Sequence, residues 1–237
     1  NVALSIGGYY DRNDGFFTNS FNGKKADKEE SVGARLGLEW MISPQFKAIY
    51  NFSFDYSEQG AFPYGLYNPE TKETAAVSIN DSSTYNRRMI GNQLRLEYKS
   101  NQFTLSSTTG YRHLKDNMNM DQDFSPLSIF TLNQKQKQNA FSQEIALKSN
   151  QPTNYQWSVG LYGFYDDLHT DGPVTFKEDG VKTVLQSVFD RLKASIPRMP
   201  QLIILDEQIY IPGSFDTPTY GLALYHQSTI NNLFSEG

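Results

Sequence analysis

The stretch Phe141–Asp166, FSQEIALKSNQPTNYQWSVGLYGFYD, decides the fold, because apolar and polar side chains alternate on both sides of a polar turn. Trp157 and Leu161 illustrate the pattern: apolar residues at every second position, with polar or small residues between them. Side chains on a strand alternate between two faces, so each arm is predicted to be a strand with one apolar face. The turn at 149–154 contains Pro152, which breaks strand ladders. The stretch therefore predicts a β-hairpin.

The composition limits the class of protein. A chain of 237 residues is expected to form one or two domains, and 14% aromatic residues favour strands. No run of 18 apolar residues exists, which excludes a transmembrane helix, whereas a barrel strand needs only about 10 alternating residues. The net charge of −5 and a pI near 5.2 argue against nucleic-acid binding. The absence of cysteine excludes disulfides and thiolate sites.

The same alternation recurs along the chain. It predicts about eight strands, at 2–11, 31–40, 46–57, 88–98, 103–112, 141–148, 155–166 and 219–228. Asn92 is a polar residue at a position of the apolar face.

Short and long connections alternate between these strands. Short turns are predicted at 41–45, 99–102, 149–154 and after 230 with Asn231 and Asn232, and long loops at 12–30, 58–87, 113–138 and 166–217. All short turns then lie at one end of the sheet, as in outer-membrane barrels. The last long loop is predicted to contain a helix at 181–195, ended by Pro197 and Pro200, and a small hairpin at 203–211. We interpret the helix as a packed loop element over the barrel mouth; a membrane-surface helix is the alternative.

Aromatic residues mark both ends of the predicted strands. Trp40 and Trp157 lie beside short turns, and Tyr10 and Tyr165 lie at the long-loop end. Ten strand residues span roughly 33 Å, or about 25 Å when tilted, which matches the apolar band of a membrane barrel. We therefore predict an all-β fold, part of an antiparallel up-and-down transmembrane β-barrel with about eight strands and long loops. A soluble β-sandwich is the alternative; it predicts turns of mixed length at both ends and aliphatic cores.

Four segments carry a resemblance to a known family. They are FSQEIAL at Phe141–Leu147, WSVGLY at Trp157–Tyr162, GYYDRNDGF at Gly8–Phe16 and YGLALY at Tyr220–Tyr225. With them the sequence resembles the TonB-dependent outer-membrane receptors, nearest to the branch that includes ferric-siderophore receptors.

The resemblance implies a plugged barrel of about 22 strands in the outer membrane of a Gram-negative bacterium. Residues 1–237 are then expected to be the middle portion of that barrel, with the plug domain absent. The implied function is binding and import of a scarce nutrient, a ferric siderophore foremost, with energy from the TonB system acting through the plug. Two open sheet edges would allow self-association of the fragment. The alternative function is a small self-contained barrel acting as an anchor or adhesin.

The face on which each side chain lies, inferred from the alternation, selects the candidate site residues. Charged residues predicted to face the lumen and to contact the plug are Arg35, Glu39, Lys47, Arg95 and Glu97. Nearer the long loops, arginine suits an anionic iron chelate, and aromatic rings suit an aromatic or sugar group. The candidate ligand-binding residues are Tyr9, Arg87, Arg88, Arg112, Tyr64 and Tyr67, with Phe62 beside them.

No catalytic or metal-binding pattern is evident. His113, His169 and His226 are far apart and lack metal-ligand spacing, and no nucleophile elbow, phosphate loop or dinucleotide fingerprint occurs. Alternating oxygens at 117–123 lack the glycine and distal glutamate of a calcium loop, so we interpret them as a polar loop, with calcium as the alternative. We predict no enzyme activity, no cofactor and no metal.

Overall fold

The computed structural model describes residues 1–60, 62–151 and 154–231. Most of them form β-strands, and the described helical turns lie between Glu178 and Ser195. The elements are, in chain order, β1 (Val2–Asn13), β2 (Glu29–Met41), β3 (Phe46–Gly60), β4 (Tyr67–Asn68), β5 (Glu73–Thr74), β6 (Thr84–Lys99), β7 (Phe103–Asp121), β8 (Phe130–Ser149), β9 (Tyr155–Asp171), β10 (Val174–Phe176), α1 (Glu178–Gly180), a π-helical turn (Val181–Leu185), α2 (Gln186–Ser195), β11 (Ile209–Ile211) and β12 (Ser214–Ile230).

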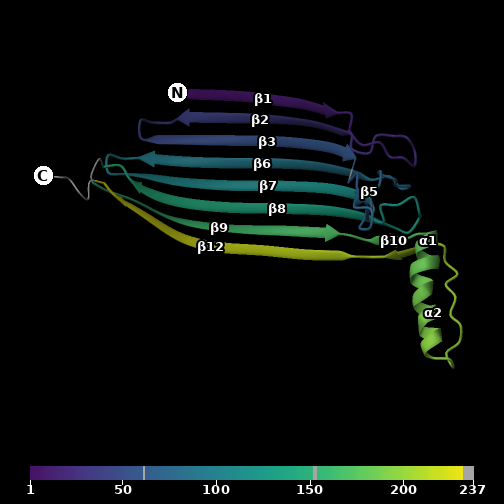
Figure 1. The fold of residues 1–237 in the computed structure, drawn as a ribbon. Coiled ribbons are helices and arrows are strands. Elements are labelled where there is room, and N and C mark those ends of the chain that lie inside the picture. Colours follow the sequence, from purple (N-terminus) through teal and green to yellow (C-terminus); the bar gives the residue numbers. More distant parts are fainter. Residues whose placement is uncertain (61, 152–153, 232–237) are drawn as a thin grey trace.

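Eight long strands form one antiparallel sheet in the order β1-β2-β3-β6-β7-β8-β9-β12 (Figure 1). Each long strand pairs with the long strand that follows it in the chain, which is up-and-down topology. The predictions of about eight strands and of an all-β antiparallel fold are confirmed. Strands β1 and β12 form the two edges, and no described residue pairs with the outer side of either.

The two ends of the sheet differ as the sequence predicts (Figure 1). The connections at one end are short, at 42–45, 100–102 and 150–154, and those at the other end hold loops 14–28, 61–83, 122–129 and 172–213. Pro152 in the third turn and Asn232 after β12 lie outside the described residues.

The strand register separates an apolar face from a polar face. Leu36 lies directly opposite Ile6 and Phe52, whereas its neighbour Arg35 lies opposite Gly7 and Ser53 on the other side of the sheet. The apolar face is open: Tyr220 is 80% exposed and Leu222 is 85% exposed. A soluble sandwich would bury such a face under a second large sheet, and the described residues form only this one and the two-residue β4–β5 ladder. The parity prediction is therefore confirmed, and the sandwich alternative is wrong.

Asn92 does lie on the apolar face, as predicted, and it is paired there. The hydroxyl of Tyr50 on β3 donates a hydrogen bond of 2.7 Å to the side-chain oxygen of Asn92 on β6. A polar group in an apolar setting is costly unless it is hydrogen-bonded, so the pair explains how this face tolerates an amide.

Aromatic residues border the apolar face at both ends. The register places on this face the residues of both proposed girdles, namely Trp40, Phe46, Tyr98, Phe103, Tyr155 and Trp157 near the short turns and Tyr10, Tyr56, Tyr111 and Tyr165 toward the long loops. The second border shifts along the strands: Tyr10 is in the same cross-strand row as His169, four residues beyond Tyr165. A band that crosses the strands obliquely is expected where barrel strands tilt.

Two strands are much longer than the sequence predicts. Residues 113–121 continue β7 and residues 130–138 belong to β8, so the loop predicted at 113–138 shortens to 122–129. These extensions carry polar residues on both faces. These parts of β7 and β8 lie beyond the apolar band and need no apolar face. An alternating pattern therefore does not mark them in the sequence.

The segment after β9 differs from the prediction. The hairpin predicted at 203–211 is wrong, because Ile209–Ile211 pairs with Val174–Phe176 instead. Strands β10 and β11 thereby prolong the β9–β12 ladder past a break, where the amide of Gly172 donates to the carbonyl of Gly213 at 2.8 Å. The three residues of β10 also pair with β8.

The predicted helix is present but is packed only at its start. Helical structure begins at Glu178, three residues earlier than predicted, and Val181 is buried whereas Val188 and Leu192 are exposed. Figure 1 shows α2 extending from the long-loop end past the edge strand β12. No described helix has the length and apolar character needed to cross a membrane.

Candidate functional site

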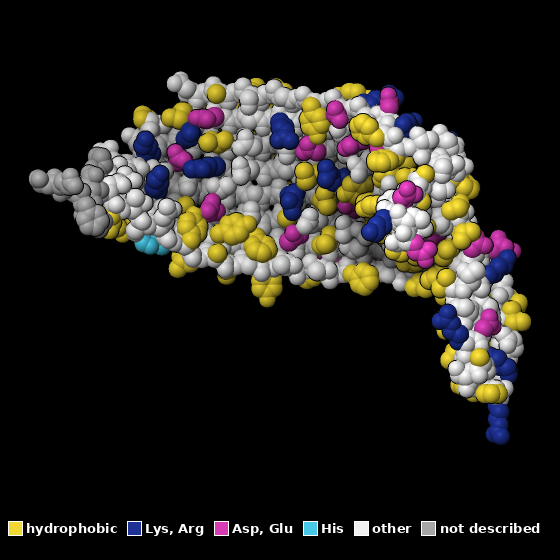
Figure 2. All heavy atoms as spheres, viewed as in Figure 1, with side chains coloured by type: hydrophobic (Ala, Val, Ile, Leu, Met, Phe, Trp, Pro, Cys, Tyr) yellow, Lys and Arg dark blue, Asp and Glu magenta, His cyan; other side chains and the backbone are white. Residues whose placement is uncertain are grey.

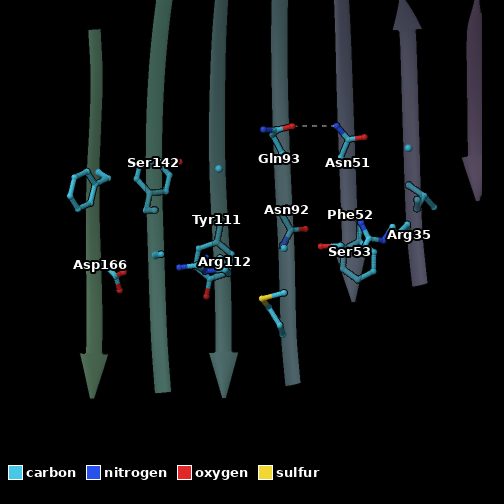
Figure 3. Close-up of a pocket in the computed structure, with 18 of the residues that line it drawn as sticks. Arg35, Asn51, Phe52, Ser53, Asn92, Gln93, Tyr111, Arg112, Ser142 and Asp166 are labelled. Carbon is cyan, nitrogen blue, oxygen red and sulfur yellow. Dashed lines mark hydrogen bonds between the residues drawn. The ribbon is translucent and has the colours of Figure 1, made fainter. Parts of the chain in front are cut away.

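A hollow of about 890 Å³ lies along the polar face, against residues from seven neighbouring strands. Figure 2 shows charged side chains of both signs scattered over the hollowed face that is turned toward the viewer. Figure 3 shows the residues around the hollow on successive strands, with Asn51 and Gln93 joined by a hydrogen bond of 3.4 Å. Ligand sites of 300–1,000 Å³ are typical for small molecules, so the hollow is the candidate site.

Small residues make the floor of this hollow. A Cβ atom on Gly91 would lie 2.7 Å from the hydroxyl oxygen of Ser53, and one on Gly110 would lie 2.7 Å from that of Ser142. These glycines lie on strands β6 and β7, each opposite the serine that its Cβ would meet. The floor therefore stays low because pairs of small side chains face each other across neighbouring strands.

Two arginines line the hollow in the same cross-strand row as Gly91, and a third lies four residues nearer to the long loops. Arg35, Arg87 and Arg112 come from β2, β6 and β7, and the register places all three on the polar face. Arg87 and Arg112 are exposed and make no salt bridge with a described residue. Exposed guanidinium groups that no salt bridge holds can bind carboxylate or similar oxygens in a planar, two-point manner.

The acids near these arginines are more buried than the arginines. Asp55 accepts a hydrogen bond of 3.0 Å from the Tyr9 hydroxyl and lies 3.6 Å from the Arg35 guanidinium, with side-chain exposures of 14% for Asp55 and 68% for Arg35. Asp116 is buried, lies opposite Arg87 and accepts a hydrogen bond of 3.1 Å from the Tyr85 hydroxyl. Asp166, by contrast, lines the hollow itself, so a solute there meets this carboxylate together with Arg35 and Arg112.

Tyr9 also has a structural task. Its ring covers Gly33, where an added Cβ would lie 2.1 Å from a ring carbon. The residues Tyr9, Gly33 and Asp55 lie directly opposite one another on β1, β2 and β3. The glycine leaves the space through which the tyrosine reaches the third strand. The sequence analysis did not find this arrangement, because alternation alone does not indicate which glycine a ring covers.

The charged residues predicted to contact a plug lie lower on the polar face, toward the short turns. Lys47 and Glu39 form a salt bridge of 3.4 Å, and Arg95 and Glu97 form one of 2.9 Å. Arg35, the fifth member, lies higher and belongs to the arginine group described above. Within each pair the positive and the negative charge compensate each other.

The remaining ligand candidates do not face the hollow. Arg88 lies on the apolar side of the sheet, because it follows Arg87 directly in a strand. Tyr64 stacks on Phe62 at a ring separation of 5.9 Å and meets Phe124 of the 122–129 loop edge to face at 5.2 Å. Tyr67 is an exposed residue of β4. Of the six candidates, Arg112 lines the hollow, Tyr9 and Arg87 lie on the same face nearer to the long loops, and the other three lie elsewhere.

The long loops are joined above the site by buried polar contacts. Asp121 is 0% exposed, and one of its oxygens accepts from the Asp81 amide at 3.2 Å, while the other has no partner among the described residues. Burial, with the charges of Asp123 and Asp81, raises the pKa of the Asp121 carboxyl. Asp81 also forms a salt bridge with Lys177, which ties the 61–83 loop to the segment after β10.

These contacts do not support the alternative of a calcium site at 117–123. Asn117 and Asn119 are strand residues of β7, and Asp123 accepts hydrogen bonds from the amides of Ser125 and Ile129 within its own loop. The described residues contain no group of three or more His, Cys, Asp or Glu side chains placed to hold a metal ion.

Comparison with known proteins defines the fold. The sequence matches no family model and no curated protein. Among solved structures, the crystal structure of the ferric yersiniabactin uptake receptor FyuA from Yersinia pestis matches 95% of this chain with a TM-score of 0.56 and 10% identity. The RagAB peptide importer in its closed-closed state matches 97% of the chain with a TM-score of 0.48 and 10% identity.

The sheet has the fold of an outer-membrane β-barrel wall. The chain spans 39% of the length of the FyuA chain. In a barrel wall of this kind, the apolar face is the outer, lipid-facing side, and the polar face lines the interior. The hollow, the small-residue floor and the three arginines therefore belong to the interior side of the wall.

Proposed function

We propose that this barrel wall is part of an outer-membrane receptor of a Gram-negative bacterium that binds and imports a scarce nutrient, a ferric siderophore foremost. The fold shared with FyuA, which is itself called a ferric yersiniabactin uptake receptor, supports a role in uptake. The observation that carries the ligand proposal is the pair of interior arginines Arg35 and Arg112, which line the hollow in the same cross-strand row as the floor residue Gly91, with Arg87 four residues nearer to the long loops.

The chemistry of the hollow suits an anionic chelate. Arg87 and Arg112 would donate charge-assisted hydrogen bonds to carboxylate, catecholate or hydroxamate oxygens, while Asp55 holds Arg35 in place. Such bonds to charged groups contribute about 1.5–3 kcal/mol each. The small residues of the floor leave room for a ligand of several hundred Å³, and Tyr64 and Tyr67 are loop residues that a chelate passes on its way in.

Energy coupling would involve the charged residues of the polar face that lie between the hollow and the short turns. We propose that the Lys47–Glu39 and Arg95–Glu97 pairs contact a plug domain, through which the TonB system acts. Exposed surface pairs contribute little stability by themselves, about 0–1 kcal/mol, so their value would lie in recognition of the plug.

The two edge strands also need partners. Strand β1 and the 17-residue strand β12 each present unpaired backbone groups along one side. We propose that further strands of the same barrel pair with them and that, without such strands, copies of the chain associate edge to edge. A self-contained barrel acting as an anchor or adhesin would instead pair β1 with β12, and the described strands do not do so.

Ligand binding tests the proposal through a neighbouring pair of arginines. The intact protein is titrated with ferric catecholate, hydroxamate and carboxylate chelates, with cobalamin and with oligosaccharides. For the anionic ferric chelate that binds, Arg87→Ala and Arg112→Ala should each weaken affinity about tenfold or more. Arg88→Ala is the matched control, since it removes the same side chain from the outer face and should leave the affinity unchanged. Binding of cobalamin or oligosaccharide alone, or equal losses for Arg87→Ala and Arg88→Ala, would contradict the proposal.

A further inference from the structure

One cross-strand row of the hollow carries opposite charges on either side of a small residue. Arg112 on β7 lies directly opposite Ala140 on β8, and Ala140 lies directly opposite Asp166 on β9. All three residues line the hollow. Figure 3 shows Arg112 and Asp166 at the same level of the sheet. Neighbouring strands are about 4.8 Å apart, so the backbones of these two residues are separated by about 10 Å, with only a methyl group between their side chains.

The Asp166 carboxylate is not neutralised by the residues around it. One of its oxygens accepts a hydrogen bond of 2.6 Å from the side-chain amide of Gln138, and the other is shielded from water and accepts from no described residue. Its neighbour on β12, Thr219, is uncharged. A carboxylate oxygen that loses water without gaining a donor is unfavourable, and a donor brought by a ligand would remove this penalty.

The carboxylate can present an oxygen to the hollow. Asp166 is half-buried and lines the hollow, so it is within reach of a bound molecule. Rotation about the last bond of an aspartate side chain has a broad range of allowed angles. A partial turn about this bond therefore aims an oxygen at a ligand and leaves the backbone of β9 in place.

Two aromatic rings extend the same wall. Phe164 and Tyr162 lie two and four residues before Asp166 on β9, on the same face, and both line the hollow. Each is 36% exposed, and their ring centroids are 6.1 Å apart. The face of an aromatic ring attracts a cation within about 6 Å of its centroid. A carboxylate beside two exposed rings therefore suits an ammonium group, whereas the guanidinium of Arg112 suits an anion.

A purely structural role does not account for this row. Arg112 and Asp166 would stabilise the sheet if they paired with each other, but no salt bridge joins them. Asp166 would also repel a wholly anionic ligand bound to Arg112, because charges about 10 Å apart still interact in a site that excludes water. A ligand that carries both signs of charge satisfies both residues.

We propose that the imported chelate carries a free amino group, which Asp166 and the rings of Phe164 and Tyr162 bind as an ammonium ion, while Arg112 binds an anionic group of the same ligand. The substrate class is then an amino-bearing ferric chelate and not a wholly anionic one. This inference rests on the proposed function, because it specifies the ligand of the same hollow.

The test compares ligands that differ only in the charge of one group. Ferric catecholate, hydroxamate and carboxylate chelates, each with a free primary amine, are titrated against the intact protein in detergent, and so are the same chelates with that amine acetylated. For the chelate type that binds, acetylation should weaken the affinity about tenfold or more, since it removes a hydrogen bond between charged groups. This comparison uses the unchanged protein, so it does not depend on the folding of a variant.

Three variants locate the ammonium site. Asp166→Asn should abolish the preference for the free amine, because it keeps the shape of the side chain and removes its charge. Asp167→Asn is the matched control: this neighbour lies on the outer face, so the loss of its charge should leave the preference unchanged. Phe164→Leu should reduce the preference about two- to fivefold, because it removes one of the rings.

The outcomes separate this inference from the proposed function. Equal affinity for the free and acetylated chelates, or an unchanged preference in Asp166→Asn, would overturn the ammonium site, while binding that depends on Arg112 would still support the proposed function. Equal weakening of both forms in Asp166→Asn would assign the residue to the support of the wall and would also overturn the inference. Failure of every ferric chelate to bind in either form would overturn the proposed function and this inference with it.

Discussion

Tyr225 on β12 reaches across Gly160 on β9 and donates a hydrogen bond of 2.7 Å to Glu144 on β8. A Cβ atom on Gly160 would lie 2.2 Å from the tyrosine ring, so only glycine leaves the path open. Tyr9, Gly33 and Asp55 repeat this relationship at the opposite edge. Each edge strand is thus tied to the third strand inward by a tyrosine that crosses a glycine.

We expect Gly160→Val to loosen the β12 edge. The added side chain must displace the tyrosine ring and break its bond to Glu144, with an expected loss of about 1–3 kcal/mol, the range for a hydrogen bond to a charged group together with overpacking. Denaturant unfolding of the intact protein in detergent measures the loss. In a Tyr225→Ala background the same substitution should cost much less, and equal costs in both backgrounds would show that the tie has no energetic role.

The Tyr50–Asn92 pair predicts an unusual pattern of stabilities on the lipid-facing side. Asn92→Leu alone removes the acceptor of the Tyr50 hydroxyl, and Tyr50→Phe alone removes the donor to Asn92, so each single change should destabilise the sheet by about 1–2 kcal/mol.

The double variant Tyr50→Phe/Asn92→Leu should recover most of this loss, because it replaces both partners by apolar groups. Equilibrium unfolding in lipid vesicles measures all three variants as a double-mutant cycle. Additive losses in the double variant would mean that the two side chains do not depend on each other.

Asp121 should make stability of the loop assembly depend on pH. Because burial raises its pKa in the folded protein, the folded state binds this proton more tightly than the unfolded state does. The stabilisation is complete below the ordinary aspartate pKa and is lost as the pH rises through the raised pKa. Asp121→Asn should remove this part of the pH dependence, as measured by thermal unfolding across the acidic range. An unchanged pH profile in the Asn variant would contradict the assignment.

The Lys177–Asp81 salt bridge should control how firmly the segment after β9 is attached. Both side chains are mostly buried, so Lys177→Met leaves Asp81 without its cation and should cost about 1–3 kcal/mol locally. Faster hydrogen exchange in residues 174–186 and 77–83 is the expected signal. Lys182→Met, whose exposed pairing with Glu178 raises the pKa of the lysine, serves as the control and should leave exchange in 77–83 unchanged.

The face of the sheet on which each strand residue lies could be predicted from the sequence. Lipid outside and the polar interior impose opposite demands on neighbouring residues, so apolar and polar side chains alternate. Leu36 beside Arg35 and Leu96 beside Arg95 can be sorted by alternation, and the register agrees with that sorting. The same rule, applied to Arg87 and Arg88, shows that the two arginines cannot share a face. Treating both as ligand candidates overlooked this constraint.

Other features depend on neighbours that the sequence does not reveal. The extensions of β7 and β8 lack an apolar face, so no alternation marks them. The pairing of β11 with β10 depends on the break at Gly172 and Gly213, which joins segments about 40 residues apart. The tyrosine ties exist only through register, because each is built from residues on three strands.

The length of β7 and β8 has a consequence for any large particle that approaches the cell. Asp121 lies ten residues beyond Tyr111, about 33 Å along the strand, so in the proposed placement the hairpin tip stands well clear of the bilayer. An antibody, a phage or a protease would touch residues 122–129 before it reached the membrane plane. Within this tip Pro126 and Leu127 are exposed, so a recognition tag or a fluorophore placed there would be visible from outside the cell.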